Sequence, residues 1–176
     1  GRSDAFRRLE ASRGRPKLLA VIDMSGSMRI FWGMGGLDFI TALMVMHRRG
    51  LIDGRFILTG EAKTARLGPM DIDPRKLEQL GPGKKCDSFA AALRSLGQDL
   101  AWADTVLCYT DGDWADGDIN AGEYRKRGLD LIGTAISDSP FIRAKLCQQF
   151  GRAIMAPTAE QLGARIVSYL FERNKA

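Results

Sequence analysis

The sequence has few residues that suit a disulfide framework or a soft metal site. It contains three cysteines and a single histidine. Cys86, Cys108 and Cys147 are odd in number and show no CxxC spacing, which argues against both a disulfide scaffold and a thiolate zinc site. No stretch approaches the ~20 consecutive apolar residues that a transmembrane helix needs. We therefore expect a protein of a reducing, intracellular (cytoplasmic) compartment without a membrane span.

Motifs of the common nucleotide-binding enzymes are also missing. No GxGxxG or GxxxxGK[ST] follows an expected strand, which disfavours a Rossmann dehydrogenase and a P-loop enzyme. With 45% hydrophobic and 27% charged residues, the composition is that of an ordinary globular domain. The chain begins at Gly1 without a methionine, and we expect it to be part of a larger protein. We assign residues 1–15 to a basic N-terminal arm or linker and residues 16–173 to one domain.

The most informative stretch is Lys17–Met28, KLLAVIDMSGSM. Its apolar run Leu18–Ile22 predicts a strand buried on both faces, and this strand ends at Asp23 in a Ser/Gly loop. In an open α/β sheet, ligands bind at the carboxyl ends of such strands. Asp23, Ser25 and Ser27 would present one carboxylate and two hydroxyls there, and such hard oxygen donors suit Mg²⁺.

The segment from Asp23 to Ser27 resembles the DxSxS signature of von Willebrand factor A (VWA) domains. The resemblance implies a metal-ion-dependent adhesion site (MIDAS), in which three loops hold a divalent cation that an external ligand can complete. We expect Mg²⁺, with Mn²⁺ or Ca²⁺ as alternatives. Further along the chain, Thr110-Asp111-Gly112 resembles the family's TDG motif after an apolar strand, so Asp111 is the expected residue of the third loop.

The second loop departs from the family pattern. Members of the family place a threonine six residues before a helix leucine, and that position is Asp87 here. A shift of one residue would assign Cys86 or Ser88 instead. With Asp87, three carboxylates would face the cation and leave the site net negative. We then expect tight metal binding and a weak preference for an acidic ligand, because a further anion adds like-charge repulsion.

The order of the expected elements predicts the fold class. Alternating strands and helices imply parallel βαβ units with right-handed crossovers. A polar hairpin should add one antiparallel strand at an edge. We expect an α/β fold: a three-layer αβα sandwich with a doubly wound, mostly parallel, Rossmann-like sheet and one antiparallel edge strand. The expected helices are Leu37–Arg49, Pro74–Leu80, Ser88–Leu100, Asn120–Arg127, Pro140–Phe150 and Thr158–Phe171, and the later strands are Gly54–Gly60, Lys63–Leu67, Asp104–Asp111, Leu129–Ile136 and Arg152–Met155.

Three aromatic residues are candidates for a ligand-binding rim. Phe31 and Trp32 follow the first loop in an unusually apolar segment, and Trp114 follows the third loop among acidic residues. Each could instead fold back onto its own domain. Together with the expected metal site they predict a non-catalytic, divalent-metal-dependent protein–protein interaction module. The VWA resemblance implies a protein partner in an assembly such as a MoxR-type AAA ATPase or a Ro-like ribonucleoprotein particle.

Two other function classes stay open. The net charge of +5 comes largely from the basic termini, which a nucleic-acid-binding module would use. Alternatively, Asp23 would be the nucleophile of a Mg²⁺-dependent phosphoryl-transfer enzyme of the haloacid dehalogenase type. Against this, Ser25 stands where those phosphatases carry the acid/base aspartate. Binding that falls steeply with salt and ignores EDTA would mark the nucleic-acid binder.

Overall fold

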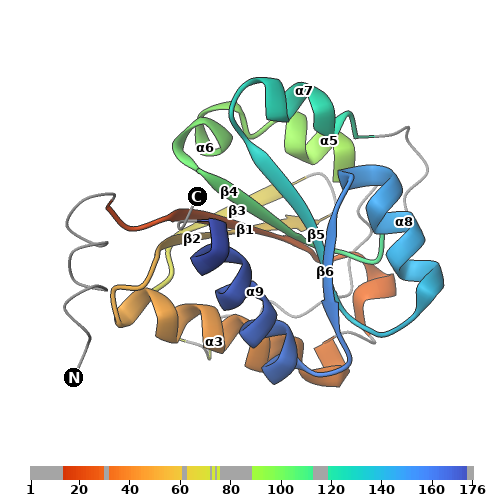
Figure 1. The fold of residues 1–176 in the computed structure, drawn as a ribbon, viewed down its shortest axis with the longest axis horizontal. Helices are drawn as coiled ribbons and strands as arrows, with labels where there is room; N and C mark the ends of the chain where they lie inside the picture. The colour runs from red at the N-terminus through yellow and green to blue at the C-terminus, as the bar shows by residue number, and fades with distance from the viewer. Residues whose placement is uncertain are drawn as a thin grey trace.

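The computed structural model describes residues 14–29, 32–60, 63–71, 73, 75, 89–112 and 119–173, which form one sheet between two layers of helices (Figure 1). In this part of the chain the sheet has six strands in the order β3-β2-β1-β4-β5-β6. The expected three-layer α/β sandwich is confirmed. The strands are β1 (Lys17–Asp23), β2 (Asp53–Gly60), β3 (Lys63–Pro69), β4 (Thr105–Tyr109), β5 (Asp130–Ile136) and β6 (Ala153–Ala156).

The sheet is parallel from β2 to β6 and antiparallel only at the β3 edge. β1 pairs in parallel with β2 on one side and with β4 on the other. β3 pairs antiparallel with β2, and the register shifts between Phe56 and Ile57. Every residue of β4 and β5 is buried, as is all of β1 except Lys17, because helices cover both faces of these central strands.

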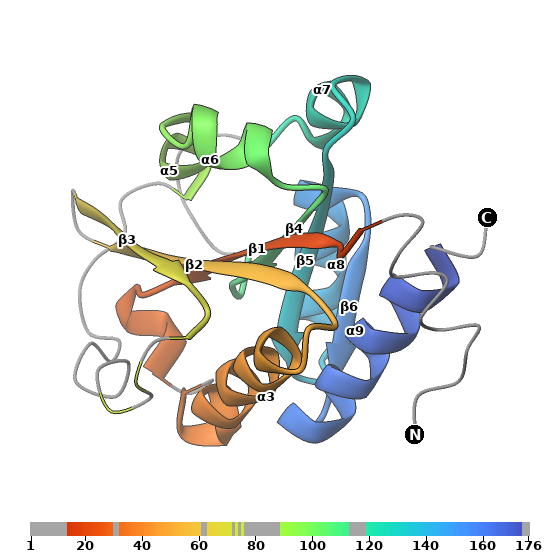
Figure 2. The same cartoon turned by 90° about the vertical axis from the view of Figure 1, so that its left-hand side faces the viewer.

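The helices divide between the two faces of the sheet (Figures 1 and 2). α3 and α9 pack together on one face, where Phe39 of α3 stacks on Tyr109 of β4 with ring centroids 5.3 Å apart. On the other face, Phe89 of α5 meets Phe150 of α8 edge-on at 6.3 Å. The helices are α3 (Leu37–Arg48), α5 (Phe89–Arg94), α6 (Gly97–Trp102), α7 (Ala121–Lys126), α8 (Pro140–Phe150) and α9 (Ala159–Arg173).

The prediction of one continuous helix from Ser88 to Leu100 is wrong, because the helix breaks between α5 and α6. The Ser95 hydroxyl donates to the Ala92 carbonyl at 2.7 Å, and the Leu96 amide bonds to Leu93 three residues back. A serine that bonds the preceding turn competes with the helical ladder. Gly97 follows directly, so the chain restarts as α6. The helix predicted at Pro74–Leu80 lies mostly outside the described residues.

Candidate metal centre

The expected first and third loops meet at the carboxyl edge of the sheet. The chain leaves β1 towards α3 and β2, whereas it leaves β4 towards α7 and β5 on the opposite side. The connections therefore diverge between two adjacent strands, and such a divergence opens a crevice where ligands bind in open α/β sheets. Asp23 is the last residue of β1, and Thr110 directly follows β4.

Asp23 is buried at this edge of the sheet, with only 2% of its surface exposed. One carboxylate oxygen, Oδ1, accepts the Ser25 backbone N–H at 2.9 Å. The other, Oδ2, accepts the Thr110 hydroxyl at 2.7 Å. The Gly112 amide in turn donates to the Thr110 Oγ1 at 3.2 Å. These bonds hold the first and third loops to one carboxylate.

The charge of Asp23 has no cationic partner among the described residues. Burial is the largest effect and raises the pKa of Asp23 above its ordinary value. The hydrogen bonds from Ser25 and Thr110 lower this pKa, while the nearby Asp111 raises it further. A dication bound beside the carboxylate would stabilise the ionised form, so the arrangement fits a metal ligand or its close support.

The first loop holds two hydroxyl groups side by side. Ser25 Oγ and Ser27 Oγ lie 3.1 Å apart, on a turn of 3-10 helix that spans Gly26–Met28. The fully buried Met28 anchors this turn in the core, while Ser27 stays exposed. Two oxygens at right angles around Mg²⁺, each at about 2.1 Å, lie about 3.0 Å apart. Here the two hydroxyls form a hydrogen bond with each other, at a spacing close to one edge of a magnesium octahedron.

Strand β2 supports the first loop from the other side. Thr59 is the register partner of Asp23, and its carbonyl accepts the Met24 amide at 2.9 Å. Its hydroxyl donates to the Ile22 carbonyl at 3.1 Å. Thr59 is 1% exposed, so both bonds are shielded from water. The backbone that carries Asp23 is thus fixed by β2 as well as by β4.

The structure brings four of the five predicted metal-site residues to this edge. Asp23, Ser25 and Ser27 share the first loop, and the partly exposed Asp111 follows Thr110 close enough to act on the pKa of Asp23. Asp87, with its alternatives Cys86 and Ser88, lies outside the described residues. So do Phe31 and Trp114, and of Trp32 only the backbone, in a π-helical turn Trp32–Gly36, is described.

Hydroxyls rather than a carboxylate cluster dominate the described part of the site. Within residues 14–112 and 119–173, gaps excepted, no three His, Cys, Asp or Glu side chains gather closely enough to hold a metal ion. A cation would therefore depend on Ser25 and Ser27, on the acids Asp23 and Asp111, and on water. Retention of several waters is usual for Mg²⁺. The ligand roles of the individual residues stay predictions.

Sequence reasoning missed the part that Thr110 plays. The TDG motif drew attention to Asp111, yet the threonine before it makes the direct contact with Asp23. A polar residue directly after a buried strand that neighbours β1 was the available signal. Sequence reasoning also missed Phe141, which lies at the start of α8 and is 69% exposed. Met34, 49% exposed, lies in the apolar segment after the first loop that the sequence analysis singled out.

The comparisons agree with this architecture. No protein-family model matches the sequence, and no curated protein sequence matches it. Among solved structures, the SpRpn10 VWA domain aligns with a TM-score of 0.53 at 10% identity, over 86% of this chain and 94% of that domain. The chain has the fold of a VWA domain. At such low identity the likeness establishes the fold alone.

Two further structures share the VWA fold of this chain to a similar degree. The manganese-loaded TRAP protein of Plasmodium vivax has a TM-score of 0.60 at 20% identity, over 86% of this chain and 72% of TRAP. The pilus adhesin SpaC from Lactobacillus rhamnosus GG has a TM-score of 0.55 at 14% identity, over 93% of this chain. The chain spans 30% of the length of SpaC. Among the described residues we find no helix with the length and apolar character needed to cross a bilayer.

Proposed function

We propose that this VWA-fold chain is a protein-interaction module whose partner binding depends on a divalent cation at the carboxyl edge of the sheet. The observation that carries the proposal is the buried Asp23 carboxylate, which accepts hydrogen bonds but has no cation among the described residues. The same loop carries the hydroxyls of Ser25 and Ser27, which lie 3.1 Å from each other. Mg²⁺ is the expected ion, with Mn²⁺ and Ca²⁺ as alternatives. The manganese-loaded state of TRAP supports a divalent ion in this fold.

The surface around the site suits contact with a protein. Phe141 and Met34 stand exposed on the elements that follow β5 and β1, so both belong to the carboxyl edge. A Cβ on Gly112 would meet Lys145 Cβ at 3.1 Å, which places α8 against the third loop. Exposed apolar groups beside a polar centre are typical of protein interfaces. An AAA-type ATPase or a Ro-like assembly inside the cell is the setting that the sequence resemblance predicts.

Neither alternative function gains comparable support. A phosphatase of the haloacid dehalogenase type would need an acid/base aspartate two residues after Asp23, and this chain has Ser25 there. For nucleic acid, residues 1–13 of the basic arm lie outside the described residues. Near the other terminus, Arg165 donates to the Met155 carbonyl and so has a role within the fold. We therefore propose a non-catalytic module.

Calorimetric titration of Mg²⁺, Mn²⁺ and Ca²⁺ into metal-stripped protein tests the proposal. We expect saturable binding in the wild type and its loss in Asp23→Asn, which keeps the shape of the side chain and one of its two acceptor oxygens but removes the charge. Ser27→Ala should weaken binding without removing it. Asp53→Asn is the matched control, because Asp53 begins β2 at the amino end of the parallel strands; this variant should bind the metal ions as the wild type does.

Partner capture then tests the interaction itself. A partner that binds the wild type with Mg²⁺, and that is released by EDTA and by Asp23→Asn, would support the module. Saturable metal binding with partner binding that ignores EDTA would contradict the metal dependence. Absence of metal binding in the wild type would show that the fold is present without the proposed chemistry.

A further inference from the structure

Strand β6 forms a free edge of the sheet beside a cleft. β6 pairs in parallel with β5, and among the described residues no strand pairs with its other side. That side faces a cleft of about 420 Å³ between α8 and α9. In Figure 1, β6 runs between these two helices at the edge of the sheet. The cleft is separate from the candidate metal centre, which lies between β1 and β4.

The register shows which backbone groups of β6 face the cleft. Gly133 donates its amide to the Arg152 carbonyl and is the register partner of Ala153. In a parallel ladder this pattern turns the polar groups of residues 152 and 154 towards β5 and those of Ala153 and Met155 outward. Consistently, the Met155 carbonyl accepts a hydrogen bond from Arg165 of α9. The amide and carbonyl of Ala153 thus point towards the cleft, whereas Met155 is 1% exposed and its carbonyl is already bonded to Arg165.

The opposite edge carries protective features that β6 lacks. β3 contains Lys63, Arg66 and Pro69, and its pairing with β2 is irregular between Phe56 and Ile57. Charged residues, proline and bulges are the means by which proteins keep edge strands from pairing with other chains. β6 reads Ala-Ile-Met-Ala and has none of these. Its described protection is its shortness and the single contact from Arg165.

The walls of the cleft are basic. Arg143 of α8 and Arg165 of α9 line it, with Glu172 as the one acid among the lining residues. We propose that this cleft binds an extended, acidic segment of a partner protein, which pairs with β6 by backbone hydrogen bonds to Ala153 while a carboxylate pairs with Arg143. Strand addition supplies affinity through the main chain, and the flanking charges supply specificity.

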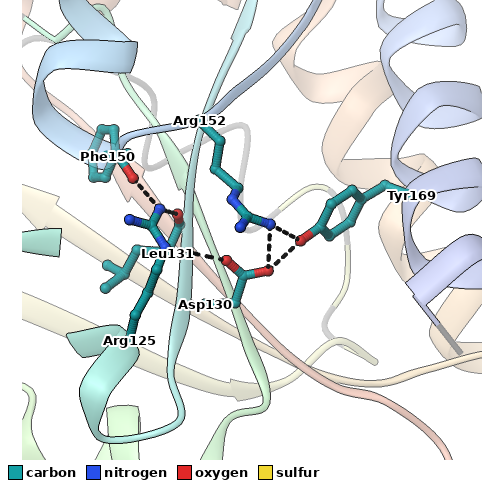
Figure 3. Close-up of polar contacts among 6 residues, drawn as sticks. All are labelled: Arg125, Asp130, Leu131, Phe150, Arg152 and Tyr169. Atoms are coloured by element: carbon teal, nitrogen blue, oxygen red, sulfur yellow. Dashed lines mark hydrogen bonds and ion pairs between the residues drawn. The ribbon is translucent and has the colours of Figure 1, made fainter. Parts of the chain in front are cut away.

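The start of β6 is held rigidly, which reduces the ordering needed on binding. Arg152 precedes the strand, and its Nη1 lies 2.9 Å from the Tyr169 hydroxyl and 3.6 Å from Asp130 Oδ2 (Figure 3). The Tyr169 hydroxyl also donates to Asp130. This network joins the beginnings of β5 and β6 to α9 next to the cleft. A preformed edge of this kind lowers the entropic cost of association.

A peptide selection on a metal-independent background tests the proposal. Immobilised Asp23→Asn protein in EDTA is offered a random seven-residue peptide library on phage, so that ligands of the metal centre are excluded. We expect enrichment of peptides that combine Asp or Glu with β-branched residues. For a selected peptide labelled with fluorescein, Arg143→Glu should weaken binding about tenfold or more, and binding should weaken with salt. Arg48→Glu, an exposed arginine near the end of α3, should leave it unchanged.

Backbone pairing is tested separately from charge. Ala153→Pro removes an outward amide at the first residue of an edge strand, where proline is tolerated, and should abolish peptide binding while the protein stays folded. In ¹⁵N-labelled protein, the peptide should increase hydrogen-exchange protection at the amide of Ala153 and not at that of Ile154. No added protection at Ala153, no enriched acidic peptide, or equal displacement by a single-stranded oligonucleotide would each overturn the proposal.

Discussion

Two buried aspartates, one at the carboxyl end and one at the amino end of the parallel strands, have different kinds of partners. Asp130 begins β5 and is 8% exposed, and Tyr169, Arg152 and Arg125 surround it (Figure 3). Asp23 ends β1 and is 2% exposed, yet its described partners are a threonine hydroxyl and a backbone amide. Asp130 is paired with arginines of its own chain. Asp23 has no such cation among the residues that the structure describes.

The contrast separates a structural acid from a candidate ligand. A buried charge is expensive unless it is paired, so the arginines around Asp130 explain how the chain tolerates that residue. Arg125 also donates to the Phe150 carbonyl, which fastens α7 to α8. At Asp23 no described residue offsets this cost, which leaves room for a bound cation to do so. The difference teaches that burial alone does not mark a site, whereas burial without a counter-charge does.

The largest effect on stability is expected where the paired acid is removed. Asp130→Ala removes the anion that pairs with Arg152 and Arg125 and the acceptor of the Tyr169 hydroxyl. It should destabilise the protein by about 3 kcal/mol, a value that allows for the partial exposure of the arginines. Urea unfolding should give the same loss with and without Mg²⁺. Asp138→Ala, an exposed aspartate after β5, should stay within about 0.5 kcal/mol of the wild type. If the loss of stability in Asp130→Ala depended on Mg²⁺, Asp130 would not be the purely structural acid that the contrast with Asp23 requires.

A slightly smaller effect on stability is expected when Mg²⁺ supplies a counter-charge to Asp23. Mg²⁺ at 100 times its dissociation constant should stabilise the wild type by about 2.7 kcal/mol, because it binds the folded state selectively. Asp23→Asn should show no such gain, and Asp130→Asn should keep it. Thermal melts with and without metal make the measurement. An equal gain in Asp23→Asn would place the ion elsewhere.

Much of this architecture was open to prediction from local pattern. The apolar runs of β1, β4 and β5 and the Asp and Thr-Asp-Gly that follow them indicate the sheet and two of its loops, because a strand buried on both faces leaves a long hydrophobic signal. The break at Ser95 escaped because it rests on one side-chain bond to Ala92. The partners of Asp130 escaped because they come from three elements far apart in sequence, and only the fold brings them together.

Removal of the Thr110 hydroxyl should have a moderate effect at the site. Thr110→Val keeps the shape of the side chain but takes a 2.7 Å donor from Asp23. Metal-free protein should lose about 1.5 kcal/mol, as expected for a hydrogen bond to a charged group. Metal affinity should fall as well, because the hydrogen bond that joins the Asp23 carboxylate to the third loop is lost. Thr110→Ser keeps the hydroxyl and should restore most of both in urea unfolding and calorimetry.

The smallest expected effect is the pH dependence of the metal-free protein, since hydrogen bonds to Asp23 partly oppose the effect of its burial. Burial raises the pKa of Asp23 above its ordinary 3.8, so the folded state binds this proton more tightly than the unfolded chain does. The contribution of Asp23 to stability should therefore increase as pH falls through the raised pKa towards 3.8, and decrease as pH rises. Asp23→Asn lacks this contribution, so the difference in unfolding free energy between wild type and variant isolates it. Saturating Mg²⁺ should reverse the slope, because the bound ion favours the ionised carboxylate and protons must then compete with it. A difference that does not change with pH in the metal-free proteins would contradict the effect of burial on Asp23.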